Sequence, residues 1–497
     1  MFVASNSVPT PEIVWWALLP LIVFAVSGLL LLTISSLLKK EIIWLAPTFC
    51  LTAGIFVLIS AIPMWNRIQN DGPLSFLSNS VGIDRSTIFL TSLIAIALIS
   101  TSILARPYLG REGIPASEFY VLLLLSAAGG VVMAGANDLI VLFLGIEILS
   151  IAVYVLVALH LRKIESQEGA IKYFLLGAFS SAFLLYGIAL VYGAVGTTNL
   201  IGIKNFLATS ILLEDGMLMI GFALMLVGLG FKVAVFPFHA WTPDAYQGAP
   251  TPVVIWMAAG VKVAGFAALL RVFPLTFSTY VDDWQVPMAV LSGLTVVFGS
   301  VVAVVQTNVK RMLAYSSIAH AGFILIGVQS SSMDGTAAVL FYLGVYTFLA
   351  SGSFAIATVV GGEGDSNHDL TAYKGLAKRK PALAALFTIL LLGQAGIPFT
   401  GGFIAKLGVI SSAVDTKYYF LAGIAMVSAA IAAYVYLRIL MAMYSDADAG
   451  EIEDIHVSKG VWVVIVLSSA VVIFTGLIPG PFVEITRDAV PILVGGR

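Results

Sequence analysis

Apolar stretches of roughly membrane-spanning length alternate with short polar clusters along almost the whole chain. A helix needs about 20 predominantly apolar residues to cross the hydrocarbon core of a bilayer. The polar clusters between the stretches are short, as in "NRIQNDGP", "REGIPASE" and "GGEGDSNHD". The pattern predicts an all-α polytopic membrane protein with about 14 transmembrane helices and no separate soluble domain. The predicted helices centre near residues 25, 52, 94, 125, 149, 181, 226, 262, 295, 321, 348, 395, 430 and 470.

The composition supports this prediction and excludes some functions. The 497 residues are 60% hydrophobic and only 10% charged, whereas about 25% of residues are charged in soluble proteins. A net charge of -2 gives no argument for a nucleic-acid partner. The single cysteine, Cys50, cannot form an internal disulfide or hold an iron–sulfur cluster, which needs several thiolates. The N-terminal residues "MFVASNSVPTPE" lack a basic stretch, so we expect no cleaved signal peptide.

The distribution of basic residues among the loops predicts an orientation. Loops on the cytoplasmic side of a membrane protein carry an excess of Lys and Arg. If the N-terminus lies outside, the loops that fall inside hold 13 Lys and Arg residues and the outer loops hold 7, among them Arg271. An even number of spans then places both termini on the outer side of the membrane.

Four ionisable residues lie deep within apolar stretches: Glu147, Lys232, Lys262 and Lys406. Lys262 is the midpoint of its stretch, and Glu147 lies about 13 Å along a helix from Asp138. Each such group costs about 2.5–3.5 kcal/mol at the bilayer centre, so all four would cost about 10 kcal/mol if unpaired. We therefore predict that they face a hydrated interior and exchange protons. The alternative is that they are purely structural ion pairs.

Three further residues are weaker candidates for the same path. His239 follows Lys232 closely, and His320 lies within the apolar stretch "SSIAHAGFILIG". An intramembrane histidine can instead be a hydrogen-bonding partner between helices. Lys172 lies nearer the end of its stretch, where a lysine can extend its ammonium group to the interface. The remaining histidines, His160, His368 and His456, lie at segment ends or in loops and carry no signal.

Two apolar stretches contain helix breakers close to a lysine. In "GLGFKVAVFPFHAWTPDAYQGAPTPV", Pro237 removes a backbone hydrogen bond just after Lys232. In "LLGQAGIPFTGGFIAKLGVI", glycines and Pro398 interrupt the stretch just before Lys406. Carbonyl groups freed at membrane depth are tolerated only where they are buried in protein or face water. Both stretches are therefore predicted to be discontinuous helices.

The positions of the two breaks predict an internal repeat. Paired interrupted segments in corresponding places are typical of transporters built from inverted repeats. The breaks fall in the seventh and twelfth predicted helices, which is the fourth place in each of two five-helix units. We predict N-terminal helices in residues 1–115, a first repeat in 116–280, a second repeat in 281–445, and a last helix with a tail in 446–497.

Several motifs resemble the antiporter-like membrane subunits of respiratory complex I (NADH-quinone oxidoreductase), and within that family subunit N, also called subunit 2. The resemblance covers residues from about 115 to 445. The motifs that carry it are "LFLGIEILSIAVYVLVAL", "EGAIKYFLLGAFSSAFLLYGIAL", "FKVAVFPFHAWTPDAYQGAPTPV", "NVKRMLAYSSIAHAGFILIG" and "GIPFTGGFIAKLGV".

The resemblance implies proton translocation coupled to NADH:quinone electron transfer in other subunits of a complex in the bacterial cytoplasmic membrane. It implies neighbouring antiporter-like subunits as partners, and places NADH, FMN, iron–sulfur clusters and quinone in partner subunits rather than in this chain. Glu147 resembles the family's glutamate on the fifth helix. Lys232, Lys262 and Lys406 resemble its lysines on the seventh, eighth and twelfth helices. The family also places four further positions on or beside the same axis: Lys172, His239, Lys310 and His320.

A mechanism follows as a hypothesis. Glu147 and Lys232 would form an ion pair worth about 4 kcal/mol at 4 Å and an effective dielectric constant of 20. Separation of the pair would release a proton toward Lys262 and Lys406. The main alternative function is a subunit of a cation/proton (Na⁺/H⁺) antiporter without redox coupling, followed by a solute carrier and an inert scaffold. An electron carrier is unsupported, since the sequence lacks a cysteine cluster and a glycine-rich nucleotide fingerprint.

Overall fold

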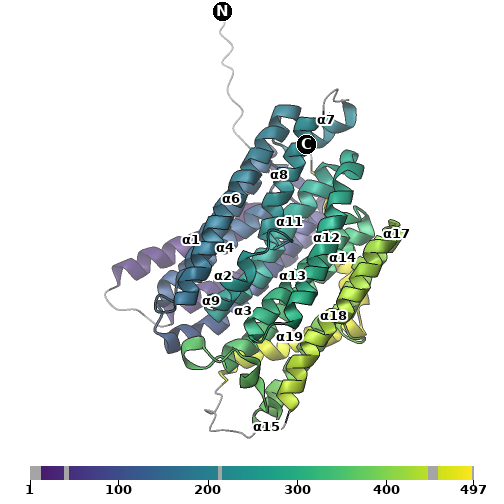
Figure 1. The fold of residues 1–497 in the computed structure, drawn as a ribbon. Helices are drawn as coiled ribbons and strands as arrows, with labels where there is room; N and C mark the ends of the chain where they lie inside the picture. The colour runs from purple at the N-terminus through teal and green to yellow at the C-terminus, as the bar shows by residue number, and fades with distance from the viewer. Residues whose placement is uncertain (1–12, 39–43, 211–214, 446–456, 495–497) are drawn as a thin grey trace, which may run out of the picture.

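The computed structural model describes residues 13–38, 44–210, 215–445 and 457–494. Figure 1 shows helices running side by side in an elongated bundle. Within these residues, twelve helices are long and apolar enough to cross a membrane, so the predicted polytopic helical fold is confirmed. They are α1 (Trp15–Leu37), α2 (Leu45–Asp71), α3 (Arg85–Glu112), α4 (Ala116–Gly135), α5 (Leu139–Ala158), α6 (Ile164–Val195), the composite helices Thr251–Thr276 and Ser278–Val304, α13 (Val309–Gln329), α14 (Met333–Val360), α18 (Tyr419–Tyr444) and α19 (Lys459–Leu477).

The two other predicted spans coincide with shorter apolar helices, each followed by a further helix. α8 (Gly216–Lys232) is followed by α9 (Trp241–Gly248), and α16 (Pro381–Ala395) by α17 (Gly401–Asp415). The remaining short helices are α7 (Leu200–Thr209), η4 (Glu363–Asp365), η5 (Leu370–Tyr373), α15 (Leu376–Arg379) and α20 (Gly480–Asp488).

The structure also contains a β-hairpin that the apolar pattern did not predict. β1 (Leu74–Phe76) pairs antiparallel with β2 (Val81–Ile83), with Ser75 opposite Gly82. Leu77, Ser78 and Asn79 turn the chain with positive φ angles. Three-residue strands are too short to show the alternation of apolar and polar residues by which strands are predicted.

The composite helix Thr251–Thr276 changes its hydrogen-bond pattern along its length. It consists of α10 (Thr251–Trp256), the π-helix η1 (Met257–Val261), α11 (Lys262–Leu270) and the π-helix η2 (Arg271–Thr276). The composite helix Ser278–Val304 consists of η3 (Ser278–Tyr280) and α12 (Val281–Val304). π-Helical turns are rare and are often found at functional sites. Here one of them ends immediately before Lys262.

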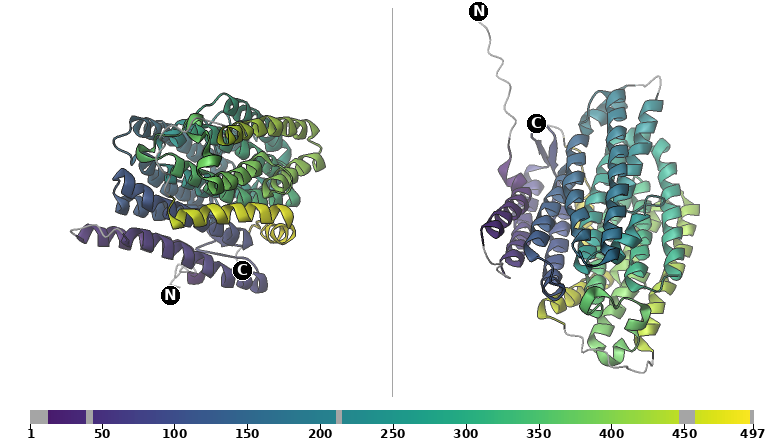
Figure 2. Two further views of the ribbon diagram at one scale, coloured as in Figure 1. Left: turned by 90° about the horizontal axis from the view of Figure 1, so that it is seen from below. Right: turned by 60° about the vertical axis from the view of Figure 1, so that its left-hand side comes forward.

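The centre of the bundle is formed by Thr251–Thr276 and α13, whose most apolar stretches are completely buried. In Figure 2, α1 and α2 (dark purple) form a layer on one flank of the bundle. They pack against α3 and α4. On α1, α2 and α6, large apolar side chains face outward, among them Leu29, Phe56 and Phe179. An ionisable residue on either central helix is therefore surrounded by protein.

The bundle has two ends, which we name after a buried carboxylate at each. At the Asp84 face, Asp84 caps the first turn of α3 by accepting a hydrogen bond from Thr87 N at 2.8 Å. Ile492 N also donates to Asp84 at 3.0 Å, so the C-terminal segment packs at this face. At the Asp365 face, α13 begins beside the loop that carries Asp365, because Val309 N donates to the His368 carbonyl. Residues 1–12 and 495–497 lie outside the described part of the chain, so the side on which the termini lie stays a prediction.

Arg271 was predicted to lie in an outer loop, but this position is wrong. Its side chain is buried in η2, and its guanidinium donates to Asp84 at 3.0 Å, to Thr87 Oγ1 at 2.7 Å and to the Ala134 carbonyl at 2.7 Å. The composite helix continues to Thr276, past residue 273 where the apolar pattern ends, and these three partners hold two of the three guanidinium nitrogens of Arg271 inside the bundle.

We expect Arg271→Met to lower the stability of the protein by about 3 kcal/mol, because it leaves Asp84 as a buried charge without its cation. Thermal unfolding of the purified protein in mild detergent measures the effect. The matched control is Arg67→Met, which removes an exposed 3.5 Å pair with Asp71. An exposed pair contributes about 0–1 kcal/mol. Equal melting temperatures for the two variants would contradict the expectation.

Candidate proton-transfer site

Lys262 lies at the centre of the bundle, at the first residue after the π-helix η1. Its side chain is buried, and Nζ donates to the Ser317 carbonyl at 2.6 Å and to Ser317 Oγ at 2.5 Å. Nζ also lies 5.0 Å from the centre of the Tyr346 ring, where an aromatic face attracts a cation. The ammonium group is thus held by α13 and α14 with no carboxylate beside it among the described residues.

Lys232 is the last residue of α8, where the chain leaves the helix before Pro237. It is buried, and Nζ donates to Ser150 Oγ on α5. Glu147, one turn earlier on the same face of α5, accepts a hydrogen bond from Ser181 on α6. Within the described residues no ion pair joins Glu147 to Lys232. Serine hydroxyls bind each charged group in this conformation, so the direct pair, which the hypothesis expects both to form and to separate, stays a prediction.

Lys406 lies on the second turn of α17 and closes the end of α16. Its Nζ donates to the carbonyls of Gln394 at 2.9 Å and Ala395 at 2.8 Å. These are carbonyls that α16 leaves unpaired at its end, where the helix dipole favours a cation. α17 approaches α16 so closely that a Cβ on Gly402 would overlap the Gly393 carbonyl oxygen. The break between α16 and α17 thus leaves free the two backbone carbonyl groups that bind the Lys406 ammonium group.

His320 connects α13 with the helices around Lys406. Its Nδ1 lies 2.7 Å from Tyr342 Oη and its Nε2 lies 3.2 Å from Tyr436 Oη. Tyr436 is 2.5 Å from Ser316 Oγ, which donates to Gln394 Oε1 at 3.2 Å. Gln394 is also the residue whose backbone carbonyl accepts from Lys406. Hydrogen bonds therefore join His320 to the side chain of Gln394, whose backbone carbonyl binds Lys406, and Ser316 is the neighbour in sequence of Ser317, which binds Lys262.

The other sequence-predicted residues are less closely connected. Lys172 is exposed and forms ion pairs with Glu168 at 2.7 Å and Asp244 at 2.8 Å. His239 is buried and packs against the rings of Phe236 and Phe298. Lys310 is fully buried near the Asp365 face and donates to the Ala249 carbonyl at 3.0 Å and to Asp365 at 3.1 Å. The structure thus brings Lys262, His320 and Lys406 together, whereas Lys172 lies apart at the surface.

Sequence reasoning missed several residues of this site. His368 was predicted to carry no signal, but it is buried and its ring Nε2 lies 2.7 Å from Asp365 Oδ1. Asp365 was not singled out, since it is one of several carboxylates in the polar cluster "GGEGDSNHD". Ser316 and Ser317 stand next to each other within an otherwise apolar stretch, and this was a signal that could have been used. His456 lies outside the described residues.

No group of three or more His, Cys, Asp or Glu side chains that could hold a metal ion occurs within the described ranges.

Comparison with known proteins identifies the family. The family described as "NADH:quinone oxidoreductase/Mrp antiporter, TM" matches residues 136–432. The chain is 38% identical to NADH-quinone oxidoreductase subunit N of Trichlorobacter lovleyi over 480 residues, which cover 96% of this chain and 97% of that protein. The chain belongs to this family. The resemblance predicted from the motifs is confirmed, and it extends well beyond residues 115–445.

Two solved structures share the fold. A chain of respiratory complex I from Thermus thermophilus superimposes with a TM-score of 0.80 at 31% identity, covering 96% of this chain and all of that chain. A chain of the Mrp complex from Dietzia sp. superimposes with a TM-score of 0.83 at 20% identity, covering 96% of this chain and 97% of that chain. The likeness to the Mrp complex chain shows the fold alone, so it gives no support to the cation/proton antiporter alternative.

Proposed function

We propose that this chain is the proton-translocating subunit N of an NADH:quinone oxidoreductase. It would move protons through half-buried Glu147 and the buried residues Lys232, Lys262, His320 and Lys406 while electrons pass from NADH to quinone in partner subunits. NADH, FMN, iron–sulfur clusters and quinone would be bound there. The observation that carries the proposal is that buried Lys262 and Lys406, on different helices, bind α13 and the end of α16, and that the Ser316–Gln394 hydrogen bond joins these two elements.

The architecture behind this function would be a pair of inverted five-helix repeats in residues 116–280 and 281–445. The interruption between α8 and α9 and the interruption between α16 and α17 would be the discontinuous helices of the two repeats. Both stand beside a buried lysine, as expected where irregular backbone borders a polar interior.

The Asp365 face would be the cytoplasmic side of a bacterial inner membrane, with both termini outside. Basic residues are concentrated at the helix ends and loops of this face, as the positive-inside rule requires. They include Arg111 at the end of α3 and Lys459 at the start of α19, together with Lys163, Lys374, Lys378, Arg379 and Lys380.

The geometry suggests how Lys232 would respond to a neighbouring subunit. In the present conformation Ser150 accepts from Lys232, while Glu147 is bound by Ser181. We propose that a second conformation pairs Glu147 directly with Lys232. The change between the two would alter the proton affinity of Lys232, since a close pair is worth about 4 kcal/mol. A proton released by Lys232 would move toward Lys262, from there through His320, and leave by Lys406.

Lys232→Ala is expected to reduce NADH-driven proton pumping by the assembled complex about tenfold, which corresponds to about 1.4 kcal/mol in the barrier. Ser150 and Glu147 remain, so water can still bind between them and carry some protons. Pumping is measured as fluorescence quenching in inside-out membrane vesicles. The matched control is Lys459→Ala at the exposed start of α19, which is expected to pump normally. Normal pumping by Lys232→Ala would contradict the proposed function.

A further inference from the structure

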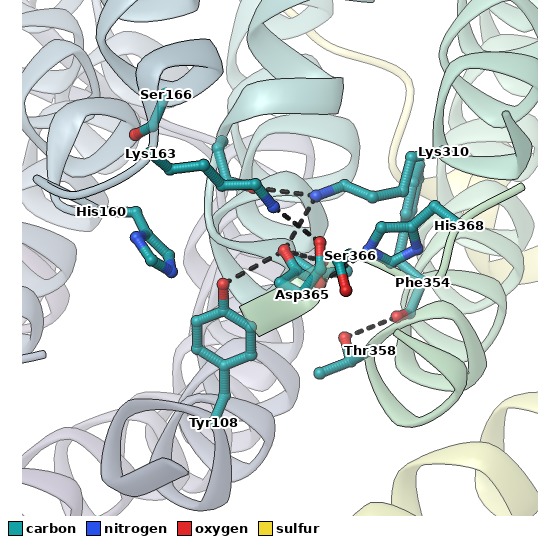
Figure 3. Close-up of polar contacts among 12 residues, drawn as sticks. Tyr108, His160, Lys163, Ser166, Lys310, Phe354, Thr358, Asp365, Ser366 and His368 are labelled. Atoms are coloured by element: carbon teal, nitrogen blue, oxygen red, sulfur yellow. Dashed lines mark hydrogen bonds and ion pairs between the residues drawn. The ribbon is translucent and has the colours of Figure 1, made fainter. Parts of the chain in front are cut away.

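A second polar cluster lies at the Asp365 face, away from the row of lysines. Figure 3 shows Tyr108, Lys310 and His368 pointing toward the carboxylate of Asp365. Tyr108 Oη donates to Asp365 at 3.1 Å, Lys310 Nζ donates at 3.1 Å, and His368 Nε2 is 2.7 Å away. Thr251 Oγ1 lies 2.8 and 2.9 Å from the two carboxylate oxygens. The carboxylate therefore has four partners from separate parts of the chain.

The cluster is buried although Asp365 belongs to a connection between helices. Asp365 is 1% exposed, Lys310 0% and His368 3%. A buried carboxylate is costly unless it is paired and hydrogen bonded, and this one is both. Lys163, in the connection between α5 and α6, adds a further contact by donating to the Asp365 carbonyl at 2.6 Å. Side chains and backbone from α3, α10, α13 and two connections thus converge on one residue.

The histidine has one nitrogen without a partner. An ionised carboxylate only accepts hydrogen bonds, so His368 Nε2 carries the hydrogen that points to Asp365. His368 Nδ1 is buried and has no hydrogen-bond partner in the described structure. Burial lowers the pKa of His368 below its ordinary value, although the hydrogen bond to Asp365 opposes this. The neutral ring therefore presents a free acceptor nitrogen, which is what a group that takes up a proton requires.

The surroundings keep Asp365 ionised. Burial alone would raise the pKa of its carboxyl group, but the charge of Lys310 and the hydrogen bond from His368 hold it well below its usual range. The titratable or charged groups near the cluster come from every element packed against it: Tyr108, Arg111 and Glu112 on α3, Lys163 in the α5–α6 connection, Lys310 on α13, and His368 and Tyr373 after α14.

The cluster is connected to Lys262 through the end of α9. Lys310 donates to the carbonyl of Ala249, the residue that follows α9. Three residues earlier, Tyr246 extends its hydroxyl to Ser317, the residue that binds Lys262. Lys310 and Ser317 lie seven residues apart on one face of α13, which is about 10 Å along the helix axis. Tyr246 occupies part of this interval.

We propose that the Asp365 cluster is the site where protons enter from the Asp365 face, with His368 as the first acceptor. A proton from solution would bind at His368 Nδ1, while the hydrogen on Nε2 passes to Asp365. Asp365 would transfer it to Lys310 when Lys310 is neutral, which regenerates the carboxylate and leaves His368 in the other tautomer. Lys310 would release it toward Tyr246, Ser317 and Lys262. Rotation of the His368 ring would then turn the Nδ1–H group toward Asp365 and leave Nε2 as the acceptor for the next proton. This proposal rests on the proposed function.

The test compares variants that remove a titrating group with variants that remove only a hydrogen bond. In the assembled complex, Asp365→Asn and His368→Gln are expected to reduce NADH-driven proton pumping about tenfold. His368→Gln retains an amide donor toward Asp365. A loss of pumping in this variant therefore reports the loss of proton uptake rather than of a hydrogen bond to Asp365. Tyr108→Phe and Thr251→Val each remove one hydrogen bond to Asp365 without removing the proton acceptor, and they are expected to lose much less pumping than His368→Gln. Native gels of each variant check assembly.

The pH dependence of proton pumping distinguishes a proton-transfer role of the Asp365 cluster from a purely structural one. Because burial lowers the pKa of His368, pumping by the parent complex is expected to respond to protonation of His368 below about pH 6.5, and His368→Gln is expected to lose that response. Normal pumping by His368→Gln, or equal losses in His368→Gln and Tyr108→Phe, would overturn the proposal and make the cluster a structural contact. If the complex that carries Asp365→Asn fails to assemble, the pumping by His368→Gln still tests the proposal. Normal pumping by Lys232→Ala would instead refute the proposed function itself.

Discussion

Lys262→Met is expected to reduce NADH-driven proton pumping by the assembled complex about 100-fold, at the lower end of the contribution of a positioned proton-transfer group. Lys262 is the central ammonium of the bundle, and its only described partners are Ser317 and the Tyr346 ring. Methionine is flexible and of similar length, so it fills the same space without a titrating group. Pumping and NADH oxidation are measured together in inside-out vesicles, because a coupled enzyme should lose both.

Lys262→Arg provides the matched comparison. Arginine keeps the positive charge and can donate to Ser317, but it does not release its proton in proteins. If Lys262 works by exchanging a proton, the arginine variant should be as inactive as the methionine variant. Recovery of pumping with arginine would show that the charge alone is needed, and that the proton passes Lys262 by another route.

The sequence predicts the spans and the central charges well, for a physical reason. Burying some twenty apolar residues per helix dominates the energetics, and this property can be read from any stretch of the chain. The cost of an ionisable group at membrane depth is similarly large. Lys262 at the midpoint of its stretch therefore had to face the protein interior, and it does so on a fully buried helix.

The partners of those charges could not be predicted in the same way. Choosing Ser150 rather than Glu147 as the acceptor for Lys232 depends on side-chain geometry between helices and on differences of about 1 kcal/mol. Likewise, the burial of Asp365 follows from five segments meeting at one end of the bundle. Nothing in the composition of its polar loop distinguishes it from neighbouring acidic residues.

Lys406→Met is expected to reduce proton pumping about 100-fold and also to destabilise the complex. The first effect follows if Lys406 is the group through which protons leave the central row. The second follows because the ammonium group binds two buried carbonyls at the end of α16. Leaving each of these unsatisfied costs about 1–3 kcal/mol. The rate of proton pumping, the rate of NADH oxidation and the melting temperature of the complex are measured on the same preparation.

Two comparisons separate these roles. Lys417→Met changes an exposed lysine beyond the end of α17 and is expected to alter neither measurement. His320→Gln interrupts the row that leads to Gln394 while leaving Lys406 bound to its carbonyls. It should therefore reduce pumping with little loss of stability. If Lys406→Met lowers the melting temperature but pumps normally, Lys406 only closes α16, and protons must leave the bundle before they reach it.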